Sequence, residues 1–165
     1  MAAQAGDRDA FAALIDGEAH AAFRVAHVIA RDERLAQDAI QEACIRAWRD
    51  LPSLRDAERW PQWFRRIAVR AAIDQARRRP REVQDGFVEG PSVVPDVSQA
   101  VAERDQVARA LRALSADERA LLALRYAADL GVPDVAAALG IPLGTAKSRL
   151  HRALAKLRAR LEIDG

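Results

Sequence analysis

The stretch VPDVAAALGIPLGTAKSRLHRALAKLRARL, residues 132–161, decides the fold class of this chain. A short segment with helical apolar spacing, 134–139, precedes a break at Gly140-Ile141-Pro142. A long basic segment then opens at Gly144-Thr145. Since glycine and proline end helices, this spacing predicts a helix-turn-helix, in which the second helix enters the DNA major groove.

The predicted second helix has two different faces at about 100° per residue. Its apolar face holds Leu143, Ala146, Leu150, Ala153, Leu154, Leu157 and Leu161. Its opposite face holds Thr145, Ser148, Arg149, Arg152 and Lys156, and Lys147 is assigned to the same candidate DNA interface. Small polar residues come first and cations later, which suits base-edge contacts followed by phosphate contacts. The alternative is that these cations only complement the helix dipole.

The rest of the chain also has helical periodicity. It predicts one helix over 7–30, or two that are broken at Gly17, a helix from about Asp32 to before Pro52, and a helix over 60–79. Residues 80–100 hold three prolines, two glycines and no apolar period, which indicates a flexible linker. Further helices are predicted over 101–114, 116–126, 133–139 and 144–161. We therefore expect an all-α protein with two small helical domains, 5–79 and 101–163, joined by the linker 80–100.

Composition limits the protein to a few classes. The 165 residues include 37 alanines, so the core must consist of closely packed, alanine-faced helices. Only 15 residues are glycine or proline and 5% are aromatic, which argues against a β-sandwich, a barrel or a disordered chain. The single Cys44 excludes an internal disulfide, and the histidines have no metal-ligand spacing, so no cofactor is expected. Without a signal peptide or an apolar run of 18 residues, the expected location is the cytoplasm, with no membrane insertion.

Charge is concentrated in two segments. The net charge is only +2, but residues 59–81 hold eight arginines and one acid, and residues 144–160 hold six basic residues and no acid. The remainder of the chain therefore carries −11. Two basic segments in an otherwise acidic chain indicate two anion-binding surfaces, for which nucleic acid is the obvious extended partner. Solvated arginine-rich helix faces are the alternative.

The predicted helix over 60–79 places aromatic residues beside a basic stripe. Single-stranded DNA suits such a surface, because rings stack on unpaired bases while arginines follow the backbone. Trp63 and Phe64 are expected in the core, and Trp60, at the helix start, is expected to be exposed for stacking. The basic stripe consists of Arg59, Arg66, Arg70 and Arg77.

The predicted helix before Pro52 presents an isoleucine among charges on the side opposite its alanine stripe. An exposed apolar residue in that setting indicates a docking patch, although a lone exposed isoleucine is also ordinary. This outward face includes Asp38, Gln41, Glu42, Ile45, Trp48 and Arg49.

These segments resemble a known family. Residues 36–48, AQDAIQEACIRAW, and 59–79, RWPQWFRRIAVRAAIDQARRR, resemble conserved region two of bacterial sigma factors. Residues 113–161, which include LGIPLGTAKSRLHRALAKLR, resemble region four. Their order and the short linker are similar to the extracytoplasmic function (ECF) group of the sigma-70 family, and the resemblance covers nearly the whole chain.

The resemblance implies a sigma factor that binds core RNA polymerase, confers promoter recognition and assists promoter melting. Asp38, Gln41, Glu42, Ile45 and Trp48 would contact the polymerase. The helix 60–79 would open and bind the minus-ten element as a single strand, and the stripe 145–156 would read the minus-thirty-five duplex. The linker would thread toward the RNA exit channel, and an anti-sigma factor is an expected further partner.

Four positions depart from the family pattern: Arg70 stands where Asn is usual, Phe64 where Leu is common, Gln37 for an acid and Asp134 for Glu. Arg70 matters most, because it exchanges a base contact for a phosphate contact. The resemblance therefore implies that this helix contacts the minus-ten element, and it does not imply which bases the helix prefers.

Three other classes are weighed against this function. A stand-alone helix-turn-helix regulator would act as a dimer, with a palindromic site and tight binding without polymerase. A sigma mimic that titrates an anti-sigma protein would lack the basic minus-ten helix. An enzyme is the least favoured class, since no triad, phosphate loop, metal set or carboxylate pair is visible, and Cys44 fits a small buried hydrophobe.

Overall fold

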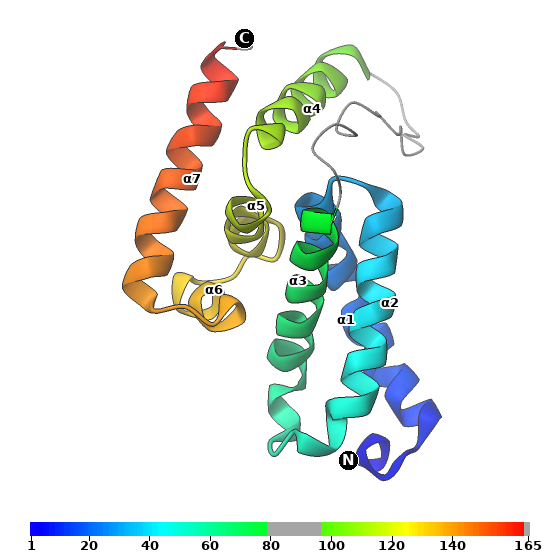
Figure 1. Ribbon diagram of the computed structural model, residues 1–165. Coiled ribbons are helices and arrows are strands. Elements are labelled where there is room, and N and C mark those ends of the chain that lie inside the picture. Colours follow the sequence, from blue (N-terminus) through cyan, green and yellow to red (C-terminus); the bar gives the residue numbers. More distant parts are fainter. Residues whose placement is uncertain (79–96, 164–165) are drawn as a thin grey trace.

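The chain is built from helices. The computed structural model describes residues 1–78 and 97–163, and no strand occurs in these two ranges. Helices α1 to α3 form one half and α4 to α7 the other, with α5 lying between α7 and the first half (Figure 1). The prediction of an all-α fold is confirmed.

The first half is a bundle of three helices, α1 (Arg8–Ala30), α2 (Glu33–Asp50) and α3 (Trp60–Arg78). Asp7 caps α1 by accepting hydrogen bonds from two backbone N–H groups, and the predicted cap Asp32 accepts one from Leu35 N–H at 3.0 Å. Carboxylates at these positions satisfy N–H groups that lack helical partners. Helix α1 is one continuous helix through Gly17, so the alternative of two helices broken there is wrong.

Alanine lets the helices of this bundle approach closely. The residues that α2 buries are Ala36, Ala39, Ala43 and Ala47, each of which is 0% exposed. A side chain of one carbon keeps neighbouring backbones near each other, so the larger core residues lie on α1 and α3. Among these are Val25, Ile29, Phe64 and Val69.

The second half contains α4 (Val97–Arg112), α5 (Ala116–Leu122), the π-helical turn η5 (Ala123–Ala127), α6 (Val132–Leu139) and α7 (Leu143–Ile163). Ser115 and Glu118 form a reciprocal capping box at the start of α5. Helix α4 begins four residues before the predicted start at 101, and residues 79–96 of the predicted linker region lie outside the described residues.

The two halves pack against each other through a shared hydrophobic core. Helix α5 lies against α1 and α3, and α6 lies against α3. Residues from both halves, including Ile29, Phe64, Leu121 and Val135, belong to one buried cluster. Each half therefore uses the other to bury apolar surface, which is a large gain for units this small.

One buried cation joins the halves. Arg119 is 7% exposed, and its Nε donates to the carbonyl oxygen of Ile29 at 2.7 Å. Its NH1 group donates to the carbonyl oxygen of Leu114 at 2.6 Å. Burial lowers the pKa of Arg119 to about 10, so the side chain stays charged at neutral pH. Ile29 lies in the last turn of α1, where carbonyls lack helical partners and carry partial negative charge.

The expectation that Trp60 is exposed is wrong. Trp60 is 4% exposed, and its indole N–H donates to the carbonyl oxygen of Leu14 at 3.2 Å. Its ring stacks on Phe64 with centroids 5.2 Å apart and meets Phe11 edge-on at 6.0 Å. The ring and its polar atom are therefore both satisfied inside the bundle. The core assignment of Phe64 is confirmed, whereas Trp63 is only partly buried.

We expect Trp60→Ala to lower the free energy of unfolding by about 3 to 5 kcal/mol, because it removes a buried ring and leaves the Leu14 carbonyl without its donor. Thermal unfolding followed by circular dichroism measures this loss. Trp63→Ala is the matched control and should cost clearly less. Equal midpoints for wild type and Trp60→Ala would contradict the core placement.

We expect Arg119→Ala to lower the free energy of unfolding by about 2 to 4 kcal/mol, because two buried carbonyl oxygens lose their donor. Urea unfolding by circular dichroism should also become less cooperative, since the halves lose the contact that couples them. Arg24→Ala, at an exposed position of α1, is the control and should change stability little. An unchanged single transition in Arg119→Ala would show that the halves are held together by other contacts.

Candidate nucleic-acid interface

The helix-turn-helix turns at Gly140. Its φ of 65° is left-handed, a conformation that glycine adopts without strain, and it ends α6. The backbone N–H of Ile141 donates to the Ala136 carbonyl at 3.0 Å, and α7 opens at Leu143. A Cβ at Gly140 would lie 3.3 Å from a guanidinium nitrogen of Arg70, so the turn lies directly beside α3.

Helix α7 presents the predicted polar stripe to solvent. Thr145 is half-buried, and the other members are exposed: Lys147, Ser148, Arg149, Arg152 and Lys156. The opposite face buries Ala146, Leu150 and Ala153 against α5 and α6. Arg149 and Arg152 form no ion pair within the described ranges, so their charge is available to an anionic ligand.

The predicted basic stripe of α3 has two paired members and two without an ion-pair partner. Arg59, in the short turn η3 (Ala57–Arg59), pairs with Asp56 at 3.2 Å. Arg77 donates a hydrogen bond to the carboxylate of Asp117 of α5 at 2.7 Å, and this contact raises the pKa of Arg77. Arg66 and Arg70 are exposed and have no ion-pair partner among residues 1–78 and 97–163.

A cleft of about 400 Å³ runs between α3 and α6. It combines cationic side chains with one partly buried indole, the combination that suits an unpaired base and its phosphate. Its lining consists of Leu54, Arg59, Gln62, Trp63, Arg65, Arg66, Leu130, Asp134, Ala137 and Ala138.

Trp63, which lines this cleft, is a candidate site residue that sequence reasoning missed. At 100° per residue it lies about 20° from Arg70 and about 40° from Arg77 around α3, whereas Trp60 lies about 80° from Arg70. The same wheel that identified the basic stripe therefore contained the signal. The general tendency of aromatic residues to form the core concealed it.

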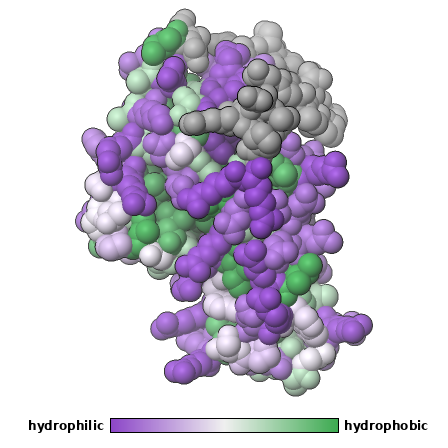
Figure 2. Space-filling model, viewed as in Figure 1, coloured by the Kyte–Doolittle hydropathy of each residue, from purple (hydrophilic) through white to green (hydrophobic). Residues whose placement is uncertain are grey.

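The two predicted DNA-binding stripes face a common space. Arg70 and Arg149 both line a pocket of about 80 Å³ beside Ile141. Arg77, Arg149 and Arg152 line a second pocket, of about 450 Å³, next to Ser115, Asp117, Glu118 and Leu121. In the view of Figure 2, hydrophilic side chains extend across the middle of the molecule, and hydrophobic ones show only in small patches between them.

Helix α2 carries the predicted docking face at a distance from this space. Asp38, Gln41, Ile45 and Trp48 are exposed, with Ile45 57% exposed. The Trp48 ring packs edge-on against the Phe11 ring of α1, with centroids 5.0 Å apart. The exposed isoleucine that the sequence predicted is confirmed.

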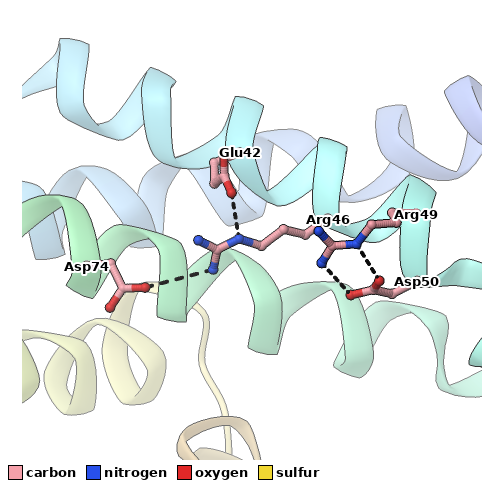
Figure 3. Close-up of polar contacts among 5 residues, drawn as sticks. All are labelled: Glu42, Arg46, Arg49, Asp50 and Asp74. Atoms are coloured by element: carbon pink, nitrogen blue, oxygen red, sulfur yellow. Dashed lines mark hydrogen bonds and ion pairs between the residues drawn. The ribbon is translucent and has the colours of Figure 1, made fainter.

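Glu42 has an internal role as well. Its carboxylate accepts a hydrogen bond from Arg46 at 2.7 Å. The same guanidinium forms an ion pair with Asp74 of α3 at 3.8 Å (Figure 3). Arg49 makes a two-pronged contact with Asp50, and this hydrogen bond lowers the pKa of Asp50 (Figure 3). Asp38, by contrast, has no ion-pair or hydrogen-bond partner in the part of the chain that the structure describes.

The described residues offer little else for chemistry. No three His, Cys, Asp or Glu side chains within these residues lie close enough to hold a metal ion. Cys44 is half-buried, and this burial raises the pKa of its thiol, which disfavours the reactive thiolate. None of the helices in 1–78 and 97–163 has the length and apolar character to cross a membrane.

Comparisons with known proteins agree on one family. Residues 14–82 match the family model for sigma-70 region 2, and residues 104–157 match the model for sigma-70 region 4. The ECF RNA polymerase sigma factor SigL of Mycobacterium tuberculosis is 35% identical over 91% of this chain and 88% of its own length. The ECF factor SigW of Bacillus subtilis is 28% identical over 94% of this chain and 91% of its own length.

Solved structures extend the likeness to three dimensions. CnrH, in complex with the cytosolic domain of CnrY, superposes with a TM-score of 0.72 at 25% identity and covers 99% of this chain and 94% of its own. The sigma factor RpoE of Bartonella quintana, in complex with the anti-sigma factor NepR, superposes with a TM-score of 0.67 at 29% identity. The match covers 92% of this chain and 96% of RpoE. With both sigma regions in order and relatives matched along most of their length, the chain belongs to the ECF group of sigma-70 RNA polymerase sigma factors.

Proposed function

We propose that this sigma factor directs core RNA polymerase to its promoters through three surfaces: α2 for the polymerase, α7 for duplex DNA and α3 for the separated strand. The observation that carries the proposal is the exposed polar stripe of α7, which follows a helix-turn-helix turn and lies in the segment matched to region 4. The functional units are residues 5–79 and 101–163, joined by 80–100. The factor works in the cytoplasm beside the polymerase and catalyses no reaction itself.

Helix α7 would read the minus-thirty-five element. Its N-terminal turn offers Thr145 and Ser148, side chains short enough to let the helix approach base edges in the major groove. Arg149 and Arg152 extend farther, and their forked guanidinium groups suit bidentate contact with guanine. Lys156, a compact charge farther along, suits a phosphate.

Helix α3 would hold the opened minus-ten strand. Its stripe Arg59, Arg66, Arg70 and Arg77 can neutralise about four phosphates, which predicts a log–log salt slope near −3 for a single strand. Trp63, beside this stripe, takes the stacking role that the buried Trp60 cannot have. A surface that binds the open strand better than the duplex shifts the equilibrium toward melting.

Helix α2 would dock on core polymerase through Asp38, Gln41, Glu42, Ile45 and Trp48, with Ile45 and Trp48 as the apolar centre and the carboxylates at its edge. The factor would also bind an anti-sigma protein, a proposal supported by the likeness to RpoE held by NepR. Transcription in vitro with core polymerase and genomic fragments, with and without this protein, tests the function as a whole.

Single substitutions in α7 should separate base contacts from phosphate contacts. We expect Arg149→Ala and Arg152→Ala each to weaken promoter binding by about 1 to 3 kcal/mol and to relax sequence choice, because they remove bidentate contacts. Lys156→Ala should weaken binding to all sequences alike. Arg158→Ala, on another side of the same helix, is the control. If all three stripe variants leave promoter-dependent transcription unchanged, α7 is not the recognition helix.

Charge reversal at Asp38 tests the docking face without disturbing the bundle. Asp38→Lys should greatly reduce co-purification with core polymerase and leave the helical circular-dichroism signal unchanged, since Asp38 has no partner inside the described chain. Reversal at Glu42 is less informative, because it would place a cation against Arg46. Asp16→Lys, at an exposed position of α1, is the control. Normal co-purification of Asp38→Lys would exclude this position from the docking face.

A further inference from the structure

A short helical turn, η1 (Ala2–Ala5), packs against the connection between α2 and α3. In Figure 1 it lies at the lower end of the bundle, where α2 ends and α3 begins. The Gln4 amide nitrogen donates to the carbonyl oxygen of Leu54 at 2.6 Å and to that of Leu51 at 3.4 Å. One side chain therefore contacts both the first residue of the turn η2 (Leu51–Ser53) and the residue that follows it.

The Leu54 carbonyl depends on Gln4 for its donor. Leu54 has an extended backbone, with ψ at 105°, and no backbone N–H within 1–78 and 97–163 donates to its oxygen. The hydrogen bond from Gln4 is partly buried, and the Ala3, Leu51 and Leu54 side chains belong to the hydrophobic core. Because a buried acceptor that loses its partner is costly, the Gln4 amide fixes this backbone position.

The segment 55–59 lies between two fixed points of the backbone. Before it, the Leu54 carbonyl is held by Gln4. After it, the Trp60 indole N–H donates to the Leu14 carbonyl oxygen at 3.2 Å. The five residues between these contacts are all exposed. A segment that is held at both ends and open to solvent between them loses little freedom when it binds a ligand.

This segment leads into the cleft beside α3. Leu54 and Arg59 line the cleft together with Trp63. Within the segment, Asp56 accepts a hydrogen bond from the Glu58 N–H at 3.0 Å and pairs with Arg59 at 3.2 Å. The place of Arg59 at the cleft therefore follows from the path that the backbone takes after Leu54.

We propose that Gln4 is a positioning residue for the opened minus-ten strand: by holding the Leu54 carbonyl, it sets segment 55–59 and Arg59 in the conformation that receives the strand. Gln4 is not part of the cleft lining, so it acts through the Leu54 backbone. The inference rests on the proposed function for the identity of the ligand. The effect of Gln4 on the segment is measurable without DNA.

Amide hydrogen exchange of the free full chain, followed by NMR, tests this effect. The backbone N–H groups of Leu54, Arg59 and Trp60 donate to backbone carbonyls, so they are protected from exchange. Gln4→Met keeps the length of the side chain and removes its donor. These three N–H groups should then exchange about two- to tenfold faster, the factor that corresponds to one lost hydrogen bond. Unchanged exchange at all three would overturn the proposal.

Gln106→Met is the matched control. The Gln106 amide of α4 donates to the carbonyl oxygen of Leu161 at 3.0 Å, so this variant removes the same kind of contact from the other half of the molecule. Both variants should lower the thermal unfolding midpoint by similar amounts, because each loses one hydrogen bond to a backbone carbonyl. Only Gln4→Met should change the exchange of residues 54–60.

Strand binding tests the consequence. Holoenzyme, assembled from core polymerase and the full chain, is titrated with a labelled single-stranded oligonucleotide of the minus-ten sequence from a promoter that the transcription assay identifies. Gln4→Met should weaken this binding by about two- to tenfold, because the freed segment must be ordered when the strand binds. Binding of the minus-thirty-five duplex should stay unchanged, since α7 lies outside the segment.

The outcomes separate this inference from the proposed function. Weaker strand binding in Gln4→Met alone, with Gln106→Met like wild type, supports the positioning role. Equal losses in the two variants show a general loss of stability and overturn it. Normal strand binding in Gln4→Met together with weaker binding in Arg66→Ala also overturns it, while the strand surface of α3 stands. Normal binding in both Gln4→Met and Arg66→Ala overturns the proposed strand surface itself.

Discussion

The arrangement of this sigma factor depends on the Arg119 guanidinium, which is buried between the halves and donates to the carbonyl oxygens of Ile29 and Leu114. A buried cation is costly unless its donors are satisfied, and the last turn of a helix supplies unpaired carbonyls with partial negative charge. This contact ties α5 to the end of α1. Since α6 and α7 follow α5 directly, it also sets where the helix-turn-helix lies relative to α3.

Because the buried side chains of α2 are all small, the aromatic residues that matter for the core and for the cleft lie on α3. Helix α2 buries alanine alone, which brings the three helices close and leaves the aromatic residues to fill one end. Trp60 and Phe64 are therefore core residues, and Trp63, one step around the helix, is the indole that reaches the cleft. Stability and the proposed strand binding thus use neighbouring positions of one helix, and a substitution there must be assayed for both.

Electrostatics connects the fold to its proposed activity. The basic stripes of α3 and α7 would repel each other across the pockets they share, and the first turn of α5 places Asp117 and Glu118 between them. The same cations that suit phosphate are thereby used inside the free molecule. Helix α2 carries the proposed docking face outside this arrangement, so the proposed polymerase contact and the proposed DNA contacts lie on separate surfaces of one chain.

The sequence by itself determined the helices, their caps and the polar stripe of α7, because these follow from periodicity and local chemistry: Asp32 caps α2, Gly140 ends α6, and Arg152 lies about 160° from Leu150 on the wheel. It did not determine which residues of other helices each of these side chains contacts. Trp60 is buried because Phe11 and Leu14 of another helix cover it. Likewise, only the tertiary structure decided that Arg77 meets Asp117 and that Arg119 reaches Ile29, since residues 40 and 90 positions apart leave no local pattern for periodicity to detect.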